Sequence, residues 1–390
     1  MRLYNTLIRK KEDFIPIKDN EVNIYVCGIT PYDTTHLGHA FVYVSFDALI
    51  RYLKFKNYKI NYTQNITDID DDILRKAKEE NKDWKEIGQF WTDKFLNDLK
   101  FLNVLPPTHY VKATDSIKKI IEIVNDLINK NLAYEKNGNV YFDVKKFKNY
   151  GELSKYNKQQ MVLISKERGG DPSDPLKKNP LDFILWQKLK EGEPFWESPW
   201  GRGRPGWHIE CSAMVNEYLG DRIDIHGGGR DLIFPHHESE IAQSESFTQK
   251  KPFVKYWMHI SMVLYEGEKM SKSLGNLIMV SKLSQKYSAN SIRWFILSHH
   301  YRQPWEFDYS EIEEAQDKIL MIEKLLDKKS DGEPDMSLWK KFESFMDDDL
   351  NTTGVLDLIY KTAGGLNSGN EKQEARNFIK KSLEILGFIL

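Results

Sequence analysis

The sequence predicts an α/β fold, in which a parallel-sheet domain is split by an insertion and followed by an all-α helical bundle. Strand and helix patterns alternate before residue 115 and again over residues 201–280. Between these parts, residues 145–200 are rich in Lys, Pro and Gly and only weakly periodic, as expected of an inserted region. After residue 281 the apolar residues recur at helical spacing. Alternating strands and helices predict a parallel sheet, whose ligands bind beyond the carboxyl ends of the strands.

The composition is that of a folded protein with two or three domains. The 390 residues are 40% hydrophobic and 29% charged and include 10 Trp, 19 Tyr and 20 Phe, which excludes a disordered chain. No apolar run reaches the roughly 18 residues that cross a bilayer, and we expect no membrane contact. The first residues lack the apolar core of a signal peptide, which predicts a cytoplasmic protein, and we expect a monomer. Because the net charge is −2, a nucleic-acid partner needs a local basic patch, such as a helical face with Lys361, Arg376, Lys380 and Lys381.

The first part of the chain, residues 1–115, begins the parallel sheet. VNIYVCG, residues 22–28, is rich in β-branched and aromatic residues and predicts a strand. The loop ITPYDTTHLGH follows, and then a helix over 40–55 and a strand over 59–63. Cys27 therefore lies at the carboxyl end of a strand, where such sheets bind ligands. Helical patterns continue over 70–103 and 116–131, and AYEKNGNVYFDV predicts a hairpin with Asn137-Gly138 in its turn.

The α/β pattern resumes after an inserted region, residues 116–200. It predicts helices over 208–218 and 235–247 and strands over 222–225 and 256–260, with a glycine-rich turn after the first of these strands. We interpret 1–115 and 201–280 as the halves of one Rossmann-type domain, 281–330 as a helical linker region and 331–390 as a C-terminal helical domain. The helical patterns of this last part cover 289–297, 311–326, 338–346, 355–366 and 371–386, and DKKSDGEPD, residues 327–335, predicts a linker.

The chain has two cysteines, Cys27 and Cys211, and the missing secretory signal disfavours a disulfide between them. Two unrelated buried thiols are the commonest outcome for free cysteines. In FPHHESE, however, His236 and Glu240 are four residues apart and share a helix face. With both thiolates they form a Cys₂-His-Glu set that suits tetrahedral zinc. His237 taken alone is as good a ligand as His236, but we expect it to point away from the face that His236 and Glu240 share.

Two further segments suit a nucleotide. HLGH opens a helix directly after a strand, so that His36 and His39 share a face near free N–H groups, and Gly38 admits a ligand close to the backbone. Such a helix start suits a polyphosphate, and solvated histidines are the alternative. KMSKS places Lys269 and Lys272 among small residues, which suits a mobile loop that closes on a pyrophosphate. A solvated surface loop is the alternative there.

A third segment, HGGGRD, follows a predicted strand and carries Gly227, Gly228 and Gly229. Three consecutive glycines suit close backbone contact with an adenosine, or they form a tight turn and nothing more. We expect Asp231 to bind a ribose hydroxyl or an ammonium group. Trp207 is expected to pack on a small substrate unless it is a core aromatic.

HLGH paired with KMSKS on a split α/β domain resembles the class I aminoacyl-tRNA synthetases, and more closely the cysteinyl-tRNA synthetase family. The segments that carry this resemblance are YVCGITPYD, NITDIDDDI, NPLDFILW, GRPGWHIECSAM, DIHGGGRDLIFPHHESEIAQS, EKMSKSLGN and MDDDLNT. The resemblance implies one zinc ion with the ligands Cys27, Cys211, His236 and Glu240, and it makes Lys272 the lysine of the signature loop that contacts ATP. We expect catalytic roles for His36, His39, Lys269 and Lys272, ATP contacts from Gly38, Gly227, Gly228, Gly229 and Lys272, and substrate contacts from Gly28, Thr67, Trp207, His226 and Asp231.

The resemblance implies that L-cysteine and ATP, with Mg²⁺, form cysteinyl-adenylate, with zinc selecting the substrate thiol over the hydroxyl of serine. Two acceptors for the cysteinyl group stay open. The first is the 3′ end of tRNA(Cys), although relatives that charge tRNA commonly extend into a further anticodon-reading module. The second is the amino group of a glucosaminyl-inositol, as in a sister family of mycothiol synthesis that GITPYDTTHLGHA, GGDPSDPLKK and VLYEGEKMSKSLGN also resemble. A catalytically silent RNA- or zinc-binding paralogue is a third hypothesis, which the intact motifs disfavour.

Overall fold

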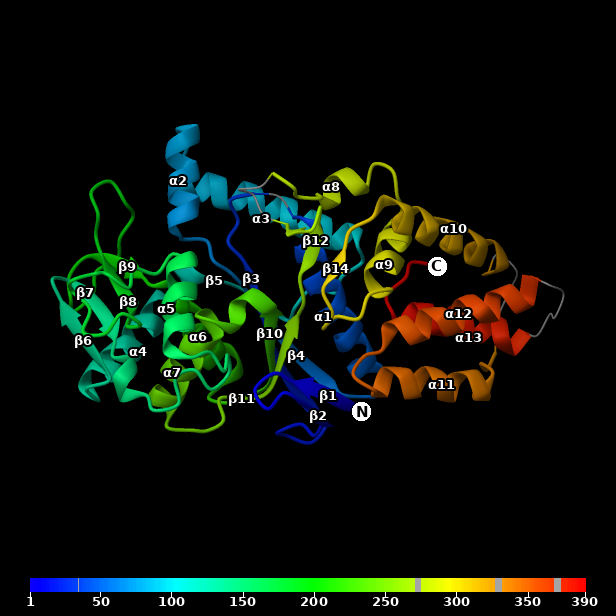
Figure 1. Cartoon of the computed structure of the whole chain (residues 1–390), viewed down its shortest axis with the longest axis horizontal. Helices are drawn as coiled ribbons and strands as arrows, with labels where there is room; N and C mark the ends of the chain where they lie inside the picture. Colours follow the sequence, from blue (N-terminus) through cyan, green and yellow to red (C-terminus); the bar gives the residue numbers. More distant parts are fainter. Residues whose placement is uncertain (34, 271–274, 327–331, 368–372) are drawn as a thin grey trace.

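A five-stranded parallel sheet forms the centre of the computed structural model (Figure 1). Its strand order is β11-β10-β3-β4-β5, and all neighbouring strands run in parallel, as the sequence predicts. The structure describes residues 1–33, 35–270, 275–326, 332–367 and 373–390. The strands of the sheet are β3 (Glu21–Ile29), β4 (Lys59–Ile66), β5 (His109–Lys112), β10 (Ile223–Gly229) and β11 (Val254–Ile260).

The two faces of this sheet support two hydrophobic cores. Along β3, Val22, Ile24 and Val26 belong to one core and Tyr25 and Cys27 to the other, because successive side chains of a strand point to opposite faces. The first core contains helix α1 (Leu37–Phe55), and the second contains α6 (Trp207–Leu219), on which α4 (Ile117–Asn129) and α7 (His236–Thr248) pack. The Cys27 side chain therefore lies on the side of α6 and α7, which carry the other predicted metal ligands.

Residues 70–103 hold two helices, α2 (Asp71–Glu80) and α3 (Trp84–Phe101). The first ends where Asn81 adopts a left-handed backbone with a φ of 51°, a conformation that asparagine tolerates better than most residues. The second begins where the Asp83 side chain accepts the N–H of Lys85, a common N-cap arrangement. The two helices share a small core of their own around Ile73, Ala77 and Ile87.

The inserted region forms an antiparallel sheet in the order β6-β7-β8-β9 (left in Figure 1). Its first turn is the predicted hairpin, with Asn137 and Gly138 both at positive φ. The last strand lies beyond the predicted boundary at residue 200, so the small sheet extends past it. The elements here are β6 (Ala133–Lys136), β7 (Asn139–Phe142), α5 (Lys158–Glu167), β8 (Phe183–Lys188) and β9 (Gly203–Pro205).

The helical bundle lies at the opposite end of the molecule from the insertion (Figure 1). All five predicted helices after residue 281 are confirmed: α9 (Ala289–Leu297), α10 (Tyr309–Leu326), α11 (Met336–Asp347), α12 (Thr352–Asn367) and α13 (Gln373–Ile385). Of the predicted linker 327–335, residues 327–331 lie outside the described residues. The remaining elements are β1 (Arg2–Asn5), β2 (Lys10–Asp13), β12 (Val263–Tyr265), β13 (Glu268–Lys269), β14 (Trp305–Glu306) and the short α8 (Val280–Leu283).

The predicted basic face on this bundle is wrong in one respect. Arg376 is buried, because its face of α13 packs into the bundle core beside Ala375 and Phe378. Lys361 lies on the neighbouring helix α12 and pairs with Asp357 at 2.6 Å. None of the helices in the described part of the chain is long and apolar enough to cross a membrane.

Candidate active site

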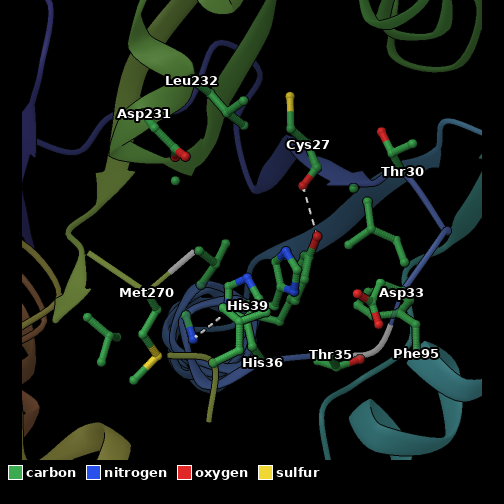
Figure 2. A pocket seen from close by; sticks show the side chains of 18 of the residues that line it. Cys27, Thr30, Asp33, Thr35, His36, His39, Phe95, Asp231, Leu232 and Met270 are labelled. Atoms are coloured by element: carbon green, nitrogen blue, oxygen red, sulfur yellow. Dashed lines mark hydrogen bonds between the residues drawn. The ribbon is translucent and has the colours of Figure 1, made fainter. Parts of the chain in front are cut away.

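A cavity of about 530 Å³ opens beyond the carboxyl ends of β3 and β10, where parallel sheets bind their ligands. Figure 2 shows Cys27 on one side of it, His36 and His39 at the start of a helix, and Asp231 and Met270 on another wall. Most of the residues predicted to act on substrates line it: Cys27, Gly28, His36, Gly38, His39, Trp207, Gly229, Asp231 and Lys269. The cavity therefore brings together residues that are up to 250 positions apart in the chain, from Cys27 to Leu277.

The first wall is the N-terminus of α1. His36 is the N-cap residue, and its Nδ1 accepts the N–H of Gly38 at 3.1 Å. The rings of His36 and His39 stack with their centres 3.8 Å apart. A Cβ at position 38 would lie 2.9 Å from the His36 ring, so glycine is the residue that fits there. A helix N-terminus with two imidazoles beside it suits an anionic ligand.

The opposite wall carries an ion pair between two of the predicted site residues. Lys269 Nζ lies 2.9 Å from Asp231 Oδ2. Burial alone would raise the pKa of the Asp231 carboxyl, but the Lys269 ammonium outweighs it and holds that pKa below its usual value. Asp231 is therefore an anion facing the cavity, next to the first lysine of KMSKS. Lys272, the second lysine, lies outside the described residues.

Beside the cavity lies a group of four buried metal-ligand side chains. Cys27 at the end of β3, Cys211 on α6, and His236 and Glu240 on α7 place one ligand atom each within 4.8 Å of one another. Trp207, which lines the cavity, stacks on the His236 ring with the ring centres 4.4 Å apart. The predicted Cys₂-His-Glu set is thus brought together at the wall of the cavity.

A second group shares Cys27 and Glu240 with the first and adds His226 and His237. His237 Nε2 lies 3.2 Å from the Cys27 sulfur and 4.0 Å from Glu240 Oε1. The expectation that His237 points away is therefore wrong, because residues three apart also share a helix face. The first group holds two thiols, which zinc prefers, and the second holds one.

Further histidines hold the outer sides of these ligands. His208 Nδ1 lies 3.0 Å from His236 Nδ1, and His226 Nε2 lies 2.8 Å from Glu240 Oε2. Each contact fixes one polar atom of a ligand side chain. The second polar atoms of these side chains, His236 Nε2 and Glu240 Oε1, point inward and lie 3.1 Å apart. Such outer partners commonly orient metal ligands.

The electrostatics of this group favour a bound cation. Burial raises the pKa of the Cys27 thiol and of the Glu240 carboxyl well above their usual values, and it lowers the pKa of His226 to about 3. Each group is therefore held neutral by its surroundings. A divalent cation would reverse this for the thiol and the carboxyl, since metal ligands bind in their deprotonated forms. The donor set and its burial thus fit a metal ion such as zinc.

Four of the described residues that are predicted to contact ATP or the substrate do not line the cavity. Gly227 and Gly228 belong to β10, and the predicted glycine-rich turn is wrong: a Cβ at Gly227 would lie 2.0 Å from the Met258 carbonyl oxygen of the next strand, so this glycine permits close packing of the sheet. His226 lies behind Glu240, as described above. Thr67 is buried, and its Oγ1 accepts from Asn65.

Sequence reasoning missed several residues that support the site. His208 and His259 hold ring nitrogens of His236 and His237, the latter at 2.8 Å. His208 lies on α6 and His259 on β11. Their distances from α7 in the sequence follow no regular spacing, so only the fold brings them to this site. In the sequence, the two adjacent histidines of FPHHESE are the feature that indicates that His237 contributes to the same site as His236.

Comparison with known proteins gives two family matches that together span most of the chain. Residues 13–317 match the family described as "tRNA synthetases class I (C) catalytic domain", and residues 341–390 match the "DALR domain". The chain is 44% identical over 409 residues to the cysteine–tRNA ligase of Thermococcus onnurineus (strain NA1), which covers 100% of this chain and 85% of that protein. It is 46% identical over 398 residues to the cysteine–tRNA ligase of Thermodesulfovibrio yellowstonii, covering 97% of this chain and 81% of that protein.

Solved structures share the fold at low sequence identity. Methionyl-tRNA synthetase of Mycobacterium tuberculosis in complex with methionyl-adenylate superposes with a TM-score of 0.64 at 14% identity, covering 94% of this chain and 88% of that chain. The ternary complex of Agrobacterium radiobacter K84 agnB2 LeuRS with tRNA and LeuAMS gives a TM-score of 0.67 at 11% identity, covering 96% and 84%. At these identities the likeness concerns the fold alone.

Proposed function

The chain belongs to the cysteine–tRNA ligase family of class I aminoacyl-tRNA synthetases, and we propose that it activates L-cysteine with ATP and transfers the cysteinyl group to the 3′ end of tRNA(Cys). One observation carries the proposal for this chain. The buried group Cys27, Cys211, His236 and Glu240 lies beside the same cavity that holds the start of α1 and Lys269. A thiol-selective centre and an anion-binding helix start therefore adjoin one another, as cysteine activation requires.

We assign zinc to the first group of donors. Its two thiolates, one imidazole and one carboxylate are ligands that zinc prefers. When bound, zinc supplies a soft Lewis acid for the thiolate of the substrate cysteine, which the hydroxyl of serine matches poorly. A site built on a specific bond to the distinguishing group discriminates by roughly 10⁴ or more without editing. Cysteine selection in this proposal thus depends on Cys27, Cys211, His236 and Glu240.

The remaining cavity residues act on ATP in this proposal. The substrate carboxylate attacks the α-phosphorus, the bond to the β-phosphate oxygen breaks, and pyrophosphate leaves. His36 and His39 donate to the phosphate oxygens at the positive end of the α1 dipole, and Lys269 and Lys272 neutralise the leaving pyrophosphate together with Mg²⁺. Positioning and charge are the main contributions in phosphoryl chemistry. Gly38 keeps the start of α1 open to the phosphates.

Asp231 has two partners in this mechanism. In the structure it pairs with Lys269 at 2.9 Å. When the substrates bind, Lys269 turns to pyrophosphate and the Asp231 carboxylate becomes available for a ribose hydroxyl or for the ammonium group of cysteine. Trp207 packs on the substrate side of His236, from which it lies 4.4 Å between ring centres. Gly28 offers a cavity wall without a side chain.

For the acceptor, the family matches favour tRNA over a glucosaminyl-inositol. The relatives described above are cysteine–tRNA ligases, and the chain carries a DALR domain over 341–390. The tRNA 3′ hydroxyl attacks the carbonyl carbon of the adenylate, and AMP leaves with the electron pair of the broken C–O bond. A monomer acting in the cytoplasm, as the sequence predicts, is part of the same proposal.

Two assays on the purified protein test this function. Cysteine should support ATP–pyrophosphate exchange and serine should not, and labelled cysteine should enter tRNA in an acid-precipitable form. An amino-sugar acceptor offered in parallel should receive none. Exchange without tRNA charging would overturn the acceptor, and no cysteine-dependent exchange would overturn the ligase proposal as a whole.

A further inference from the structure

The strand that carries Cys27 is irregular at that residue. Val26 on β3 pairs with Gln64 on β4, and Ile29 pairs with Ile66, so that three steps along β3 lie opposite two steps along β4. The extra residue is a β-bulge at Cys27 and Gly28. A bulge interrupts the ladder and changes the direction of a side chain, and its backbone groups need other partners.

Asn65 on β4 lies directly opposite this bulge and is 2% exposed. Its Oδ1 accepts the N–H of Gly28 at 2.7 Å, and its Nδ2 donates to Thr67 Oγ1 at 3.1 Å. A backbone N–H can only donate, so the amide orientation is fixed by Gly28. Thr67 Oγ1 is an acceptor in this contact, and the hydroxyl hydrogen of Thr67 is consequently directed away from Asn65.

The other side of the same peptide is held by α1. The hydroxyl of Tyr43 donates to the carbonyl oxygen of Cys27 at 3.2 Å, a contact drawn as the dashed line from Cys27 in Figure 2. The peptide between Cys27 and Gly28 thus has its C=O on Tyr43 and its N–H on Asn65. No side chain fits at Gly28, because a Cβ there would lie 1.6 Å from the Asn65 carbonyl oxygen.

We propose that Asn65 and Tyr43 are positioning residues that clamp the Cys27–Gly28 peptide and thereby aim the Cys27 sulfur at Cys211, His236 and Glu240. The clamp rests on the proposed function, since it prepares Cys27 as a ligand and Gly28 as a wall of the cysteine site. The bulge interrupts the regular hydrogen bonding between β3 and β4, so this peptide lacks its usual strand partners. The side chains of Asn65 and Tyr43 take their place. Loosening either contact should therefore weaken metal binding and cysteine binding together, while the ATP contacts at the start of α1 and at Lys269 are unaffected.

The test uses Asn65→Leu, which removes both amide contacts at similar volume, and Tyr43→Phe, which removes one hydroxyl. Zinc affinity is measured by competition with a coloured chelator, and the KM values for cysteine and for ATP by pyrophosphate exchange. We expect each variant to bind zinc about 10- to 100-fold more weakly, as for other partners of metal ligands, and to raise the KM for cysteine with the KM for ATP unchanged.

Asn61→Leu is the matched control. Asn61 occurs on the same face of β4, and its Nδ2 donates to Asn23 Oδ1 on β3 at 3.2 Å, but this contact lies before the bulge. The control should keep wild-type zinc affinity. Wild-type affinity in both Asn65→Leu and Tyr43→Phe would overturn the clamp, as would an equal loss in Asn61→Leu.

If Asn65→Leu does not fold, Tyr43→Phe decides alone, because it removes a single oxygen atom. The zinc titration also separates this proposal from the proposed function. A wild-type protein that binds zinc but activates no cysteine would overturn the proposed function. The chelator competition would still show whether Asn65 and Tyr43 position Cys27 for zinc binding.

Discussion

The two oxygens of Glu240 have different partners. Oε2 lies 2.8 Å from His226 Nε2, and Oε1 lies 3.1 Å from His236 Nε2 and 3.9 Å from the Cys27 sulfur. One oxygen is thus anchored and the other faces the remaining donors. Because both candidate donor groups contain Cys27 and Glu240, these residues do not distinguish them. Cys211 and His236 belong only to the first group, and His226 and His237 only to the second. Variants of Cys211 and His237 therefore tell the two groups apart.

Cys211→Ser is expected to lose bound zinc and to raise the KM for cysteine sharply while ATP binding is unaffected. A serine hydroxyl is a much poorer zinc ligand than a thiolate, and three donors remain. Elemental analysis of the purified variant gives the zinc content, and His237→Asn is the control, which should retain zinc. Full zinc in Cys211→Ser together with loss in His237→Asn would assign the second group instead.

His259 makes the fold sensitive to acid. Burial lowers the pKa of this imidazole to about 3, and its two nitrogens bond to His237 and to the Thr6 hydroxyl at 2.8 Å each. Its folded pKa lies below the unfolded value near 6.5, so the unfolded state binds the extra proton. The stabilising contribution is present above pH 6.5 and is lost progressively as the pH falls from there toward 3.

We therefore expect His259→Gln to reduce the acid sensitivity of the protein. Between pH 7 and pH 5.5 the wild type should lose about 1 kcal/mol more unfolding free energy than the variant, which has no imidazole to protonate. Urea unfolding of the chelator-treated proteins at both pH values measures this difference, so that zinc release does not contribute. Equal losses in the two proteins would show that His259 is protonated as readily in the folded state.

The glycines of β10 serve two purposes, close packing of the sheet and access to the cavity. A Cβ at Gly227 would lie 2.0 Å from the Met258 carbonyl oxygen and 2.5 Å from the Phe46 ring, whereas one at Gly229 would meet only the Asp231 side chain, at 2.5 Å. The first glycine is required for packing between β11 and α1, and the last faces the cavity. The carboxyl end of the strand, at Gly229, is thus the part that reaches the cavity.

Gly227→Ala and Gly229→Ala are accordingly expected to fail in different ways. The first forces backbone and ring apart and should lower the unfolding free energy by about 1–3 kcal/mol or more, measured by thermal unfolding. The second should unfold like the wild type but raise the KM for ATP or cysteine, because it displaces Asp231. Equal stability losses in both variants would contradict this division.

The sequence predicts the elements well where apolar periodicity is strong, as over α1 and α9 to α13. It also predicts that His236 and Glu240 lie together, because their spacing depends on one helix only. Cys27 and Cys211 joined the predicted donor set through the sequence around each of them and through the family resemblance. It fails for contacts that need the fold. His208 reaches His236 from another helix, and Asn65 reaches Gly28 only because β3 has a bulge that no pattern of residues reveals.

A buried charged cluster joins the helical bundle to the sheet domain. Arg293 on α9 is 0% exposed and pairs with Asp47 in the middle of α1. Its other donors reach the carbonyl oxygens of Leu386 and Leu102 at 2.8 Å each. Three segments that are distant in sequence therefore meet at one guanidinium. The same helix α1 begins with the histidines that face the cavity, so this junction and the site share one rigid element.

Arg293→Met should loosen this junction. Removing one partner of a buried ion pair costs about 3–5 kcal/mol. Asp47 keeps Arg51 as a second partner at 2.9 Å, so we expect a loss near the lower end of this range, to which the two carbonyl groups left without their donor also contribute. Arg51→Met is the control, because Arg51 pairs with the same Asp47 carboxylate at 2.9 Å from a more exposed position, and it should cost less. Thermal unfolding gives the two losses, and limited proteolysis should cut the segment after α13 in Arg293→Met but not in Arg51→Met. Similar losses and similar cleavage in both variants would mean that the C-terminal residues are held by apolar packing, with Phe388 against Trp294, rather than by this guanidinium.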